Sequence, residues 1–140
     1  MKRRHRKRWS PPEPLVSVAV FHCRLCRAIL TRPLDLLADT GALSHDENTS
    51  LVPGGYYWPV VAGKDFAGQF AIAIEDMLGV HYHPEDRRLA GCCGPSGAFG
   101  PNRVCPAGHE VGTERSDCIW PHAVYLDPTL VMGVSPDAFF

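Results

Sequence analysis

The sequence predicts a mainly β fold: a small, irregular domain that is stapled by metal through zinc-knuckle-like hairpins and contains little helix. Three observations support this prediction. The 140 residues include 13 Gly and 13 Pro, which favour turns and loops over long helices. Apolar residues alternate in short runs, as they do in strands with one buried face. Six cysteines are present, and their spacing suits a set of metal ligands.

The cellular compartment decides whether these cysteines form disulfides or bind metal. Basic residues 2–8 and the apolar run 15–21 resemble parts of a secretory signal, but the run is short and follows the Pro-rich segment 10–14. No small-residue cleavage site follows the run, and His22 precedes Cys23 where a lipoprotein signal needs a small residue. No segment approaches the ~20 apolar residues of a membrane span. We therefore expect a cytoplasmic protein whose reduced thiols are available to metal.

The charge distribution divides the chain into two parts. We expect residues 1–14 to be a basic, Pro-rich disordered arm and residues 15–140 to be a single zinc-binding, β-rich domain. Six of the 14 Lys and Arg lie in residues 2–8, whereas the 15 acidic residues all lie beyond them. The arm could bind the phosphates of nucleic acid. Alternatively, it is a solvated tail that contacts its own acidic body, and the partner is a protein.

The first element is a strand that leads into a metal-binding turn. Apolar alternation over residues 16–20 predicts the strand, and residues 28–31 predict a second strand after Cys23-Arg24-Leu25-Cys26. Strand, Cys-x-x-Cys turn and strand form a zinc knuckle, which directs both sulfurs at one tetrahedral ion. The alternative is a redox dithiol, which usually begins a helix. Pro33 disfavours a long helix after Cys26, so metal binding is preferred.

Short elements should follow in the middle of the chain. The pattern predicts an apolar turn at residues 34–37, a turn at Gly54-Gly55, a strand over residues 69–74 and a helical turn or bend over residues 75–79. The aromatic cluster at residues 56–58 could stack on bases, but we expect it to fill the core.

His81 and His83 would share one face of a strand and could bind metal. The alternative is that they are exposed loop residues, and Pro84 directly after them favours it.

The glycine-rich segment 89–111 supplies the other half of the first site. It is not a phosphate loop, because no Gly-Lys-Ser/Thr follows its glycines. Residues 103–109 are similar to a second knuckle without its own Cys-x-x-Cys. We expect one zinc ion, and its predicted ligands are Cys23, Cys26, Cys105 and either Cys92 or Cys93, with His109 in reserve. Adjacent residues of an extended chain point to opposite sides, so we expect Cys92 and Cys93 to have different roles.

A second site is possible near the C-terminal end. Cys118 and His122 are spaced to chelate one ion, and Asp117 could accept a hydrogen bond from a ligating imidazole. The remaining cysteine and His109 would complete this second zinc site. Alternatively, Cys118 is a buried thiol at the start of a strand over residues 123–126.

Over residues 15–32 and 91–126 these features resemble the zinc-ribbon and rubredoxin-knuckle class of small metal-bound β modules. The chain is also similar to small bacterial proteins in which Gly-Cys-Cys-Gly precedes a Cys and an Asp-Cys-x-x-x-His element. The resemblance implies metal but no particular activity. The chain departs from an ordinary ribbon because dispersed cysteines replace the second Cys-x-x-Cys. Gly-Cys-Cys-Gly also resembles a single copy of the Cys-Cys-Gly motif of iron–sulfur disulfide reductases, which normally recurs with further cysteines.

These patterns favour a zinc-binding, non-enzymatic interaction module that binds a protein or a nucleic acid. The alternative is a thiol- or zinc-dependent enzyme with redox or hydrolytic activity. A catalytic zinc needs three protein ligands, an open position and a general acid or base. His45-Asp46-Glu47 satisfies half of the zinc-deaminase pattern, but the Pro-Cys-x-x-Cys half is absent. We therefore expect no catalytic residues.

Overall fold

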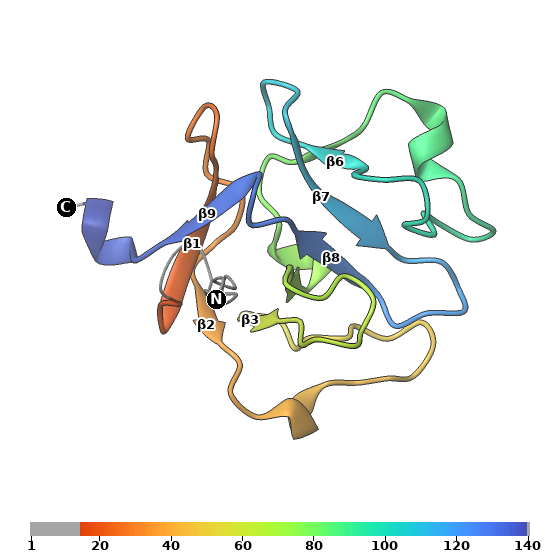
Figure 1. Cartoon of the computed structure of the whole chain (residues 1–140), viewed down its shortest axis with the longest axis horizontal. Helices are drawn as coiled ribbons and strands as arrows, with labels where there is room; N and C mark the ends of the chain where they lie inside the picture. Colours follow the sequence, from red (N-terminus) through yellow and green to blue (C-terminus); the bar gives the residue numbers. More distant parts are fainter. Residues whose placement is uncertain (1–14, 140) are drawn as a thin grey trace, which may run out of the picture.

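A computed structural model describes residues 15–139, and over this range the strands form one nine-stranded sheet (Figure 1). The strand order is β5-β6-β7-β8-β4-β3-β2-β1-β9. All described pairs are antiparallel except β2 and β3, which are parallel. The strands are β1 Val18–Cys23, β2 Leu34–Leu36, β3 Tyr56–Pro59, β4 Phe70–Ile72, β5 His81–Tyr82, β6 Arg103–Val104, β7 Glu110–Arg115, β8 Ala123–Leu126 and β9 Val131–Val134.

Helical structure in the described part of the chain is limited to 3-10 turns. They are η1 Thr40–Ala42, η2 Ile74–Asp76, η3 Asp86–Leu89 and η4 Pro136–Phe139. The prediction of a mainly β fold with little helix is therefore confirmed. Over residues 15–139, none of the helical turns has the length or the apolar character that is needed to cross a bilayer. The predicted basic arm, residues 1–14, lies outside the described residues.

The sheet curls around a hydrophobic core on its inner face. Alternate residues of neighbouring strands point into this core, as the twofold period of a strand requires. Phe21 of β1 and Tyr57 of β3 pack edge to face with their ring centroids 5.2 Å apart, and Phe70 of β4 contacts both rings. Ile72 and Val124 continue the same buried cluster across β4 and β8.

The outer face of the central strands is covered by long loops. Trp58, Ala71 and Tyr125 point to this side and form a second buried cluster with residues of the connection between β2 and β3. Phe66, from the loop between β3 and β4, stacks on Tyr125 with a centroid distance of 4.1 Å. Because both faces of β8 are covered, all four of its residues are buried. The prediction that the aromatic cluster fills the core is confirmed for Tyr57 and Trp58, which lie on opposite faces.

Two early segments differ from their predicted forms. Residues 34–37 were expected to form an apolar turn, but Leu34–Leu36 is strand β2 and lies between β1 and β3. Residues 28–31 were expected to form a strand, but they make only single bridges, between Ile29 and His22 and between Thr31 and Met77. The N–H of Phe21 donates to the hydroxyl of Thr31 at 3.2 Å in place of a backbone carbonyl, which interrupts the ladder with β1.

Candidate metal centres

The six cysteines lie in two groups, each with one further donor. Site A consists of Cys23, Cys26, Cys105 and His109, and site B consists of Cys92, Cys93, Asp117 and Cys118. Within each site the sulfur, nitrogen or oxygen donor atoms all lie within 4.8 Å of one another. Both groups could therefore hold a metal ion.

The first half of site A is the turn that follows β1. The N–H of Arg27 donates to the carbonyl of Cys23 at 2.9 Å, and the N–H of Cys23 donates to the carbonyl of Ala28 at 2.9 Å. Arg27 has a φ of 66°, the left-handed conformation in which a tight turn reverses the chain. The N–H of Ala28 points at the sulfur of Cys26. The turn thus has the form of a knuckle, with its sulfurs on one side.

The second half of site A is the turn between β6 and β7. Cys105 and His109 pair through the N–H of Cys105 and the carbonyl of His109 at 2.8 Å, and Gly108 donates to the carbonyl of Cys105 at 2.8 Å. Gly108 has a φ of +91°, which glycine adopts without strain. Burial alone would raise the pKa of the Cys105 thiol, but the N–H groups of His109 and Ala107 outweigh it and lower this pKa to about 7. The turn therefore favours a thiolate at Cys105.

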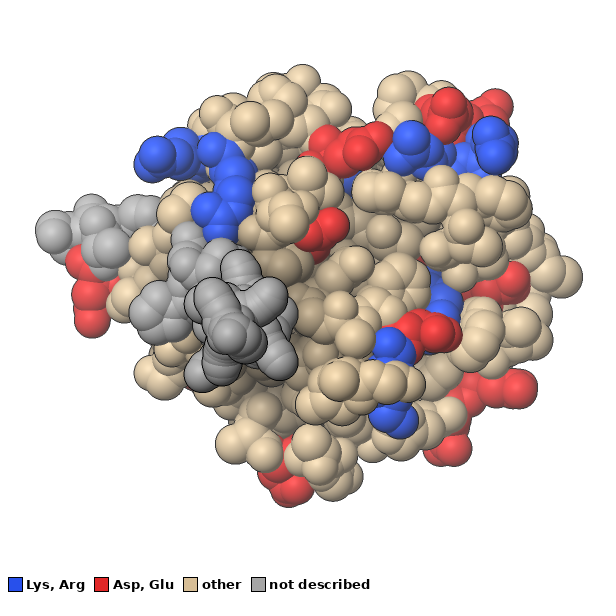
Figure 2. All heavy atoms as spheres, in the orientation of Figure 1, with Lys and Arg blue, Asp and Glu red and all other residues tan. Residues whose placement is uncertain are grey.

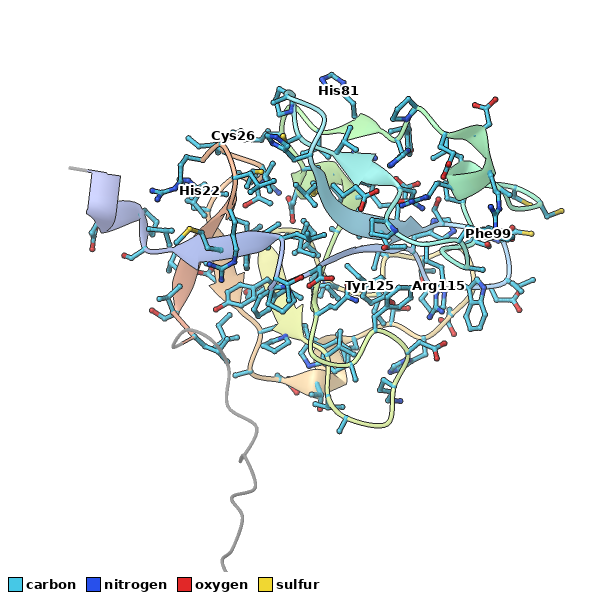
Figure 3. The ribbon with its side chains drawn as sticks, turned by 45° about the horizontal axis from the view of Figure 1, so that its top comes forward. His22, Cys26, His81, Phe99, Arg115 and Tyr125 are labelled. Carbon is cyan, nitrogen blue, oxygen red and sulfur yellow. The ribbon has the colours of Figure 1, made fainter. Side chains whose placement is uncertain are left out.

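The two turns meet although they lie far apart in the sequence. The sulfurs of Cys26 and Cys105 are 3.6 Å apart, and these residues are separated by 79 positions. Nδ1 of His109 lies 3.4 Å from the sulfur of Cys105 and 3.7 Å from the sulfur of Cys23. Both turns lie at the top of Figure 1, and Cys26 is labelled there in the turned view of Figure 3. Cys23 and Cys105 are buried, while Cys26 is exposed.

Site B joins the loop after η3 to the turn after β7. Gly91 and Gly94 flank its two adjacent cysteines, and the loop is tight: a Cβ on Gly91 would lie 1.7 Å from the carbonyl oxygen of Gly94. The N–H of Ser96 closes this loop on the carbonyl of Ala90 at 2.9 Å. The N–H of Ser116 donates to the carbonyl of Pro95 at 2.9 Å and fixes the loop to the turn.

The carboxylate of Asp117 organises site B. Its Oδ1 accepts hydrogen bonds from the N–H groups of Cys93 at 3.0 Å and of Cys118 at 2.8 Å. Its Oδ2 accepts from the N–H of Cys92 at 3.2 Å. Asp117 is buried, and hydrogen bonds from the Cys93, Cys118 and Cys92 N–H groups lower the pKa of its carboxyl below the usual value. A buried anion thus holds all three cysteine backbones of the site.

The surroundings of Cys92 and Cys118 in site B disfavour ionisation of their thiols. The hydrogen bond with Cys93, desolvation and the nearby charge of Asp117 raise the pKa of Cys118 to about 12. The same neighbours, Cys93 first and then Asp117, raise the pKa of Cys92. In both thiols the hydrogen bond with Cys93 is the largest cause, and nearby negative charge adds to it. Cys92 and Cys93 are exposed and Cys118 is half-buried, so the sulfurs are accessible from solvent.

The structure groups the predicted ligands differently from the expected sets. Cys23, Cys26 and Cys105 lie together as expected, but the reserve residue His109 is their fourth neighbour, in place of Cys92 or Cys93. Adjacent Cys92 and Cys93 both place their sulfurs in site B, so the expectation that they have different roles stays a prediction. The chain bends at these residues, and the opposite directions of an extended chain therefore do not apply.

His122 is not brought to Cys118. In the described part of the chain it belongs to neither site; its backbone instead pairs with the connection between β2 and β3, donating to the carbonyl of Thr49 and accepting from the N–H of Leu51. Asp117 likewise serves backbone N–H groups in place of an imidazole. The sequence predicted a supporting role for Asp117 from its position directly before Cys118, but it did not predict these backbone partners.

The His-x-His pair also lies outside both sites. Nε2 of His83 is 3.1 Å from Oε2 of Glu110, and its Nδ1 accepts a hydrogen bond from the N–H of Glu85 at 3.0 Å. His81 is exposed on the edge strand β5. The interpretation as an exposed residue therefore fits His81, whereas the side chain of His83 is only 16% exposed and pairs with Glu110.

We found no match to this chain among known protein families, curated proteins or solved structures.

The donor atoms of the two sites indicate which metals they could bind. Thiolate and imidazole groups select borderline or soft metals such as zinc, copper(I) and iron, whereas magnesium and calcium need oxygen ligands. Site A offers three sulfurs and one imidazole nitrogen, and site B offers three sulfurs and one carboxylate.

Proposed function

We propose that this protein is a zinc-binding, non-enzymatic interaction module in which site A holds a structural zinc ion. The geometry of the donor atoms carries this proposal. Zn–S bonds of about 2.3 Å and a Zn–N bond of about 2.0 Å in a tetrahedron place two sulfurs about 3.8 Å apart and sulfur about 3.5 Å from nitrogen. The corresponding distances in site A are 3.6 Å between sulfurs and 3.4 and 3.7 Å between sulfur and nitrogen.

The ligand set favours a structural role over a catalytic one. Three cysteines and one histidine fill all four positions of a tetrahedral zinc ion, whereas catalytic sites use three protein ligands and leave one position open. The knuckle turns direct backbone N–H groups at the sulfurs of Cys26 and Cys105, which reduces the negative charge of the thiolates. Bound zinc would therefore staple the turn after β1 to the turn between β6 and β7.

The interaction part of the proposal rests on charge. Residues 2–8 carry six of the 14 Lys and Arg, a concentration that suits phosphate groups. On the face of the described domain that Figure 2 shows, some acidic and basic side chains lie in small mixed groups, while a basic group lies at the upper left and acidic groups lie along the lower edge. We therefore assign nucleic-acid contact to the basic segment, with a protein as the alternative partner.

Native mass spectrometry with elemental analysis tests the zinc assignment. The Cys118→Ser background removes a site B donor, so the metal count reports site A. We expect one zinc ion per chain in this background and little zinc after the further change His109→Ala. The matched control is His81→Ala, which removes an exposed imidazole outside both sites and should retain the zinc. Iron in place of zinc, or full zinc retention by His109→Ala, would contradict the assignment.

Metal removal should also destabilise the fold. Structural zinc contributes its binding free energy to folding, and a small domain depends strongly on such a staple. Chelation of the Cys118→Ser protein should lower its urea midpoint by an amount that zinc restores. An unchanged midpoint in metal-free protein would show that site A does not staple the sheet.

A further inference from the structure

We infer that site B is an open metal site, in which Cys92, Cys93 and Cys118 bind a thiophilic cation such as zinc and one coordination position is left for an exogenous ligand. This inference does not rest on the zinc proposed for site A. Its basis is the way in which the fourth donor of the group, Asp117, is already engaged.

The carboxylate of Asp117 is better suited to positioning than to ligation. A carboxylate has about four lone-pair sites, and three of them receive backbone N–H groups here. Oδ1 accepts two of these hydrogen bonds, so it is saturated. Oδ2 accepts the N–H of Cys92 and keeps one lone-pair site, on a carboxylate that three backbone donors already orient. We therefore assign Asp117 to positioning the backbone of the three cysteines, with the fourth coordination position left to an exogenous ligand.

The backbone around site B is organised before any ion binds. Gly91 and Gly94 permit the tight loop, since a Cβ on Gly94 would lie 2.9 Å from the carbonyl oxygen of Ser116. The turn that carries Cys118 is anchored on both sides. Its Ser116 hydroxyl donates to the buried Glu114 carboxylate, and the Arg115 guanidinium stacks on Trp120 at 4.0 Å from the ring centroid. Both segments that supply sulfurs are thus fixed relative to each other.

Charge and exposure indicate what the site takes. Three cysteine thiols lie beside a buried carboxylate, and a bound cation would neutralise the thiolates that form when they ligate it. Sulfur donors select zinc and softer ions. Cys92 and Cys93 are exposed, so a small ligand from solvent can reach an ion bound there. Site A differs in charge, because its fourth donor is a histidine, and in exposure, because two of its cysteines are buried.

Cobalt(II) spectroscopy of the full chain tests this inference. Zinc is first supplied at one equivalent to fill the tighter site, and cobalt(II) is then titrated. We expect thiolate-to-cobalt charge-transfer bands, whose intensity reports the number of sulfurs. Addition of imidazole should shift the d–d bands while the charge-transfer intensity persists, because imidazole takes the open position. A spectrum that does not respond to imidazole would show a closed site, and no cobalt binding would overturn the inference.

Two variants assign the donors. Cys118→Ser should abolish the cobalt spectrum. Asp117→Asn keeps one acceptor oxygen but replaces the other by a donor, so affinity should fall by about 10- to 100-fold while the band positions at saturation stay the same. Shifted bands in this variant would identify Asp117 as a ligand.

Alkylation provides a second measurement on the wild-type chain. Bound metal should protect Cys92, Cys93 and Cys118 from iodoacetamide, as mapped by peptide mass analysis. Protection of the site A cysteines alone would refute the open site. The alkylation result for Cys92, Cys93 and Cys118 does not depend on how much zinc site A holds.

Discussion

The lack of a side chain at Gly91 permits the tight loop of site B. The Cβ of any residue other than glycine at position 91 would overlap the carbonyl oxygen of Gly94, at a calculated separation of 1.7 Å. Gly91→Ala should therefore displace the loop that carries Cys92 and Cys93. We expect this variant to lose cobalt binding at site B while retaining the metal of site A, as measured by the cobalt spectrum and by elemental analysis.

The matched control for this change is Gly54→Ala. A Cβ there would meet the ends of two flexible side chains, Glu75 at 3.4 Å and Arg32 at 3.8 Å, and Gly54 does not have a positive φ. This variant should keep both sites. Retention of the wild-type cobalt spectrum by Gly91→Ala would show that the tight loop is not required.

Among individual residues, the sequence predicted which residue types could bind metal better than it predicted which of them lie in the same site. The Cys-x-x-Cys spacing predicted that Cys23 and Cys26 act together, because both sulfurs lie on one short turn. The choice of His109 over Cys92 as the fourth neighbour depends on where the β6–β7 turn meets β1, which is a tertiary contact. Asp117 was underrated because its partners are backbone N–H groups, and sequence does not show these.

Strand β7 illustrates what sequence patterns missed among the elements. Glu110–Arg115 has charged residues at both ends and a glycine inside, so no strand was predicted there. In the structure Glu114 is buried, but its carboxylate pairs with Arg103 at 2.8 Å. The backbone N–H and carbonyl of Glu114 bond to the side-chain amide of Asn102 at 2.6 and 2.9 Å. Polar partners from the preceding segment thus compensate for a charged residue in the strand.

Asn102 should therefore be important for the stability of β7. Asn102→Ala leaves the buried N–H and carbonyl of Glu114 without side-chain partners, and each such group costs about 1–3 kcal/mol. We expect a loss of about 2–4 kcal/mol in the free energy of unfolding, measured by urea denaturation with metal at saturation.

An exposed threonine provides the comparison for this variant. Thr40 lies in η1 on the surface, so Thr40→Ala should change the free energy of unfolding by less than about 0.5 kcal/mol. Equal stability of Asn102→Ala and Thr40→Ala would mean that the amide contributes nothing to β7.

At the scale of the whole molecule, the β class was predictable and the strand order was not. Turn residues and short apolar runs predict strands locally, whereas the parallel pairing of β2 with β3 depends on a connection of 19 residues, 37–55, that covers the outer face. Site A depends on the same long-range order. It joins β1 to the β6–β7 turn, and four strands of the sheet lie between β1 and β7. The curl of the sheet brings them together, and no local pattern reports that curl.

The last prediction concerns the partner of the whole chain. Replacing the six Lys and Arg of residues 2–8 by Gln removes their charges but keeps the length of the segment. If nucleic acid is the partner, affinity for duplex DNA at low salt should fall, because fewer counterions are released on binding. The slope of log Kobs against log[salt] should decrease by up to about 5, since each phosphate contact contributes about 0.9. Fluorescence anisotropy over a salt series measures both quantities, and an unchanged metal content serves as the control for folding. Equal binding by both proteins, or binding by neither, would exclude the basic segment as a nucleic-acid contact and favour a protein partner.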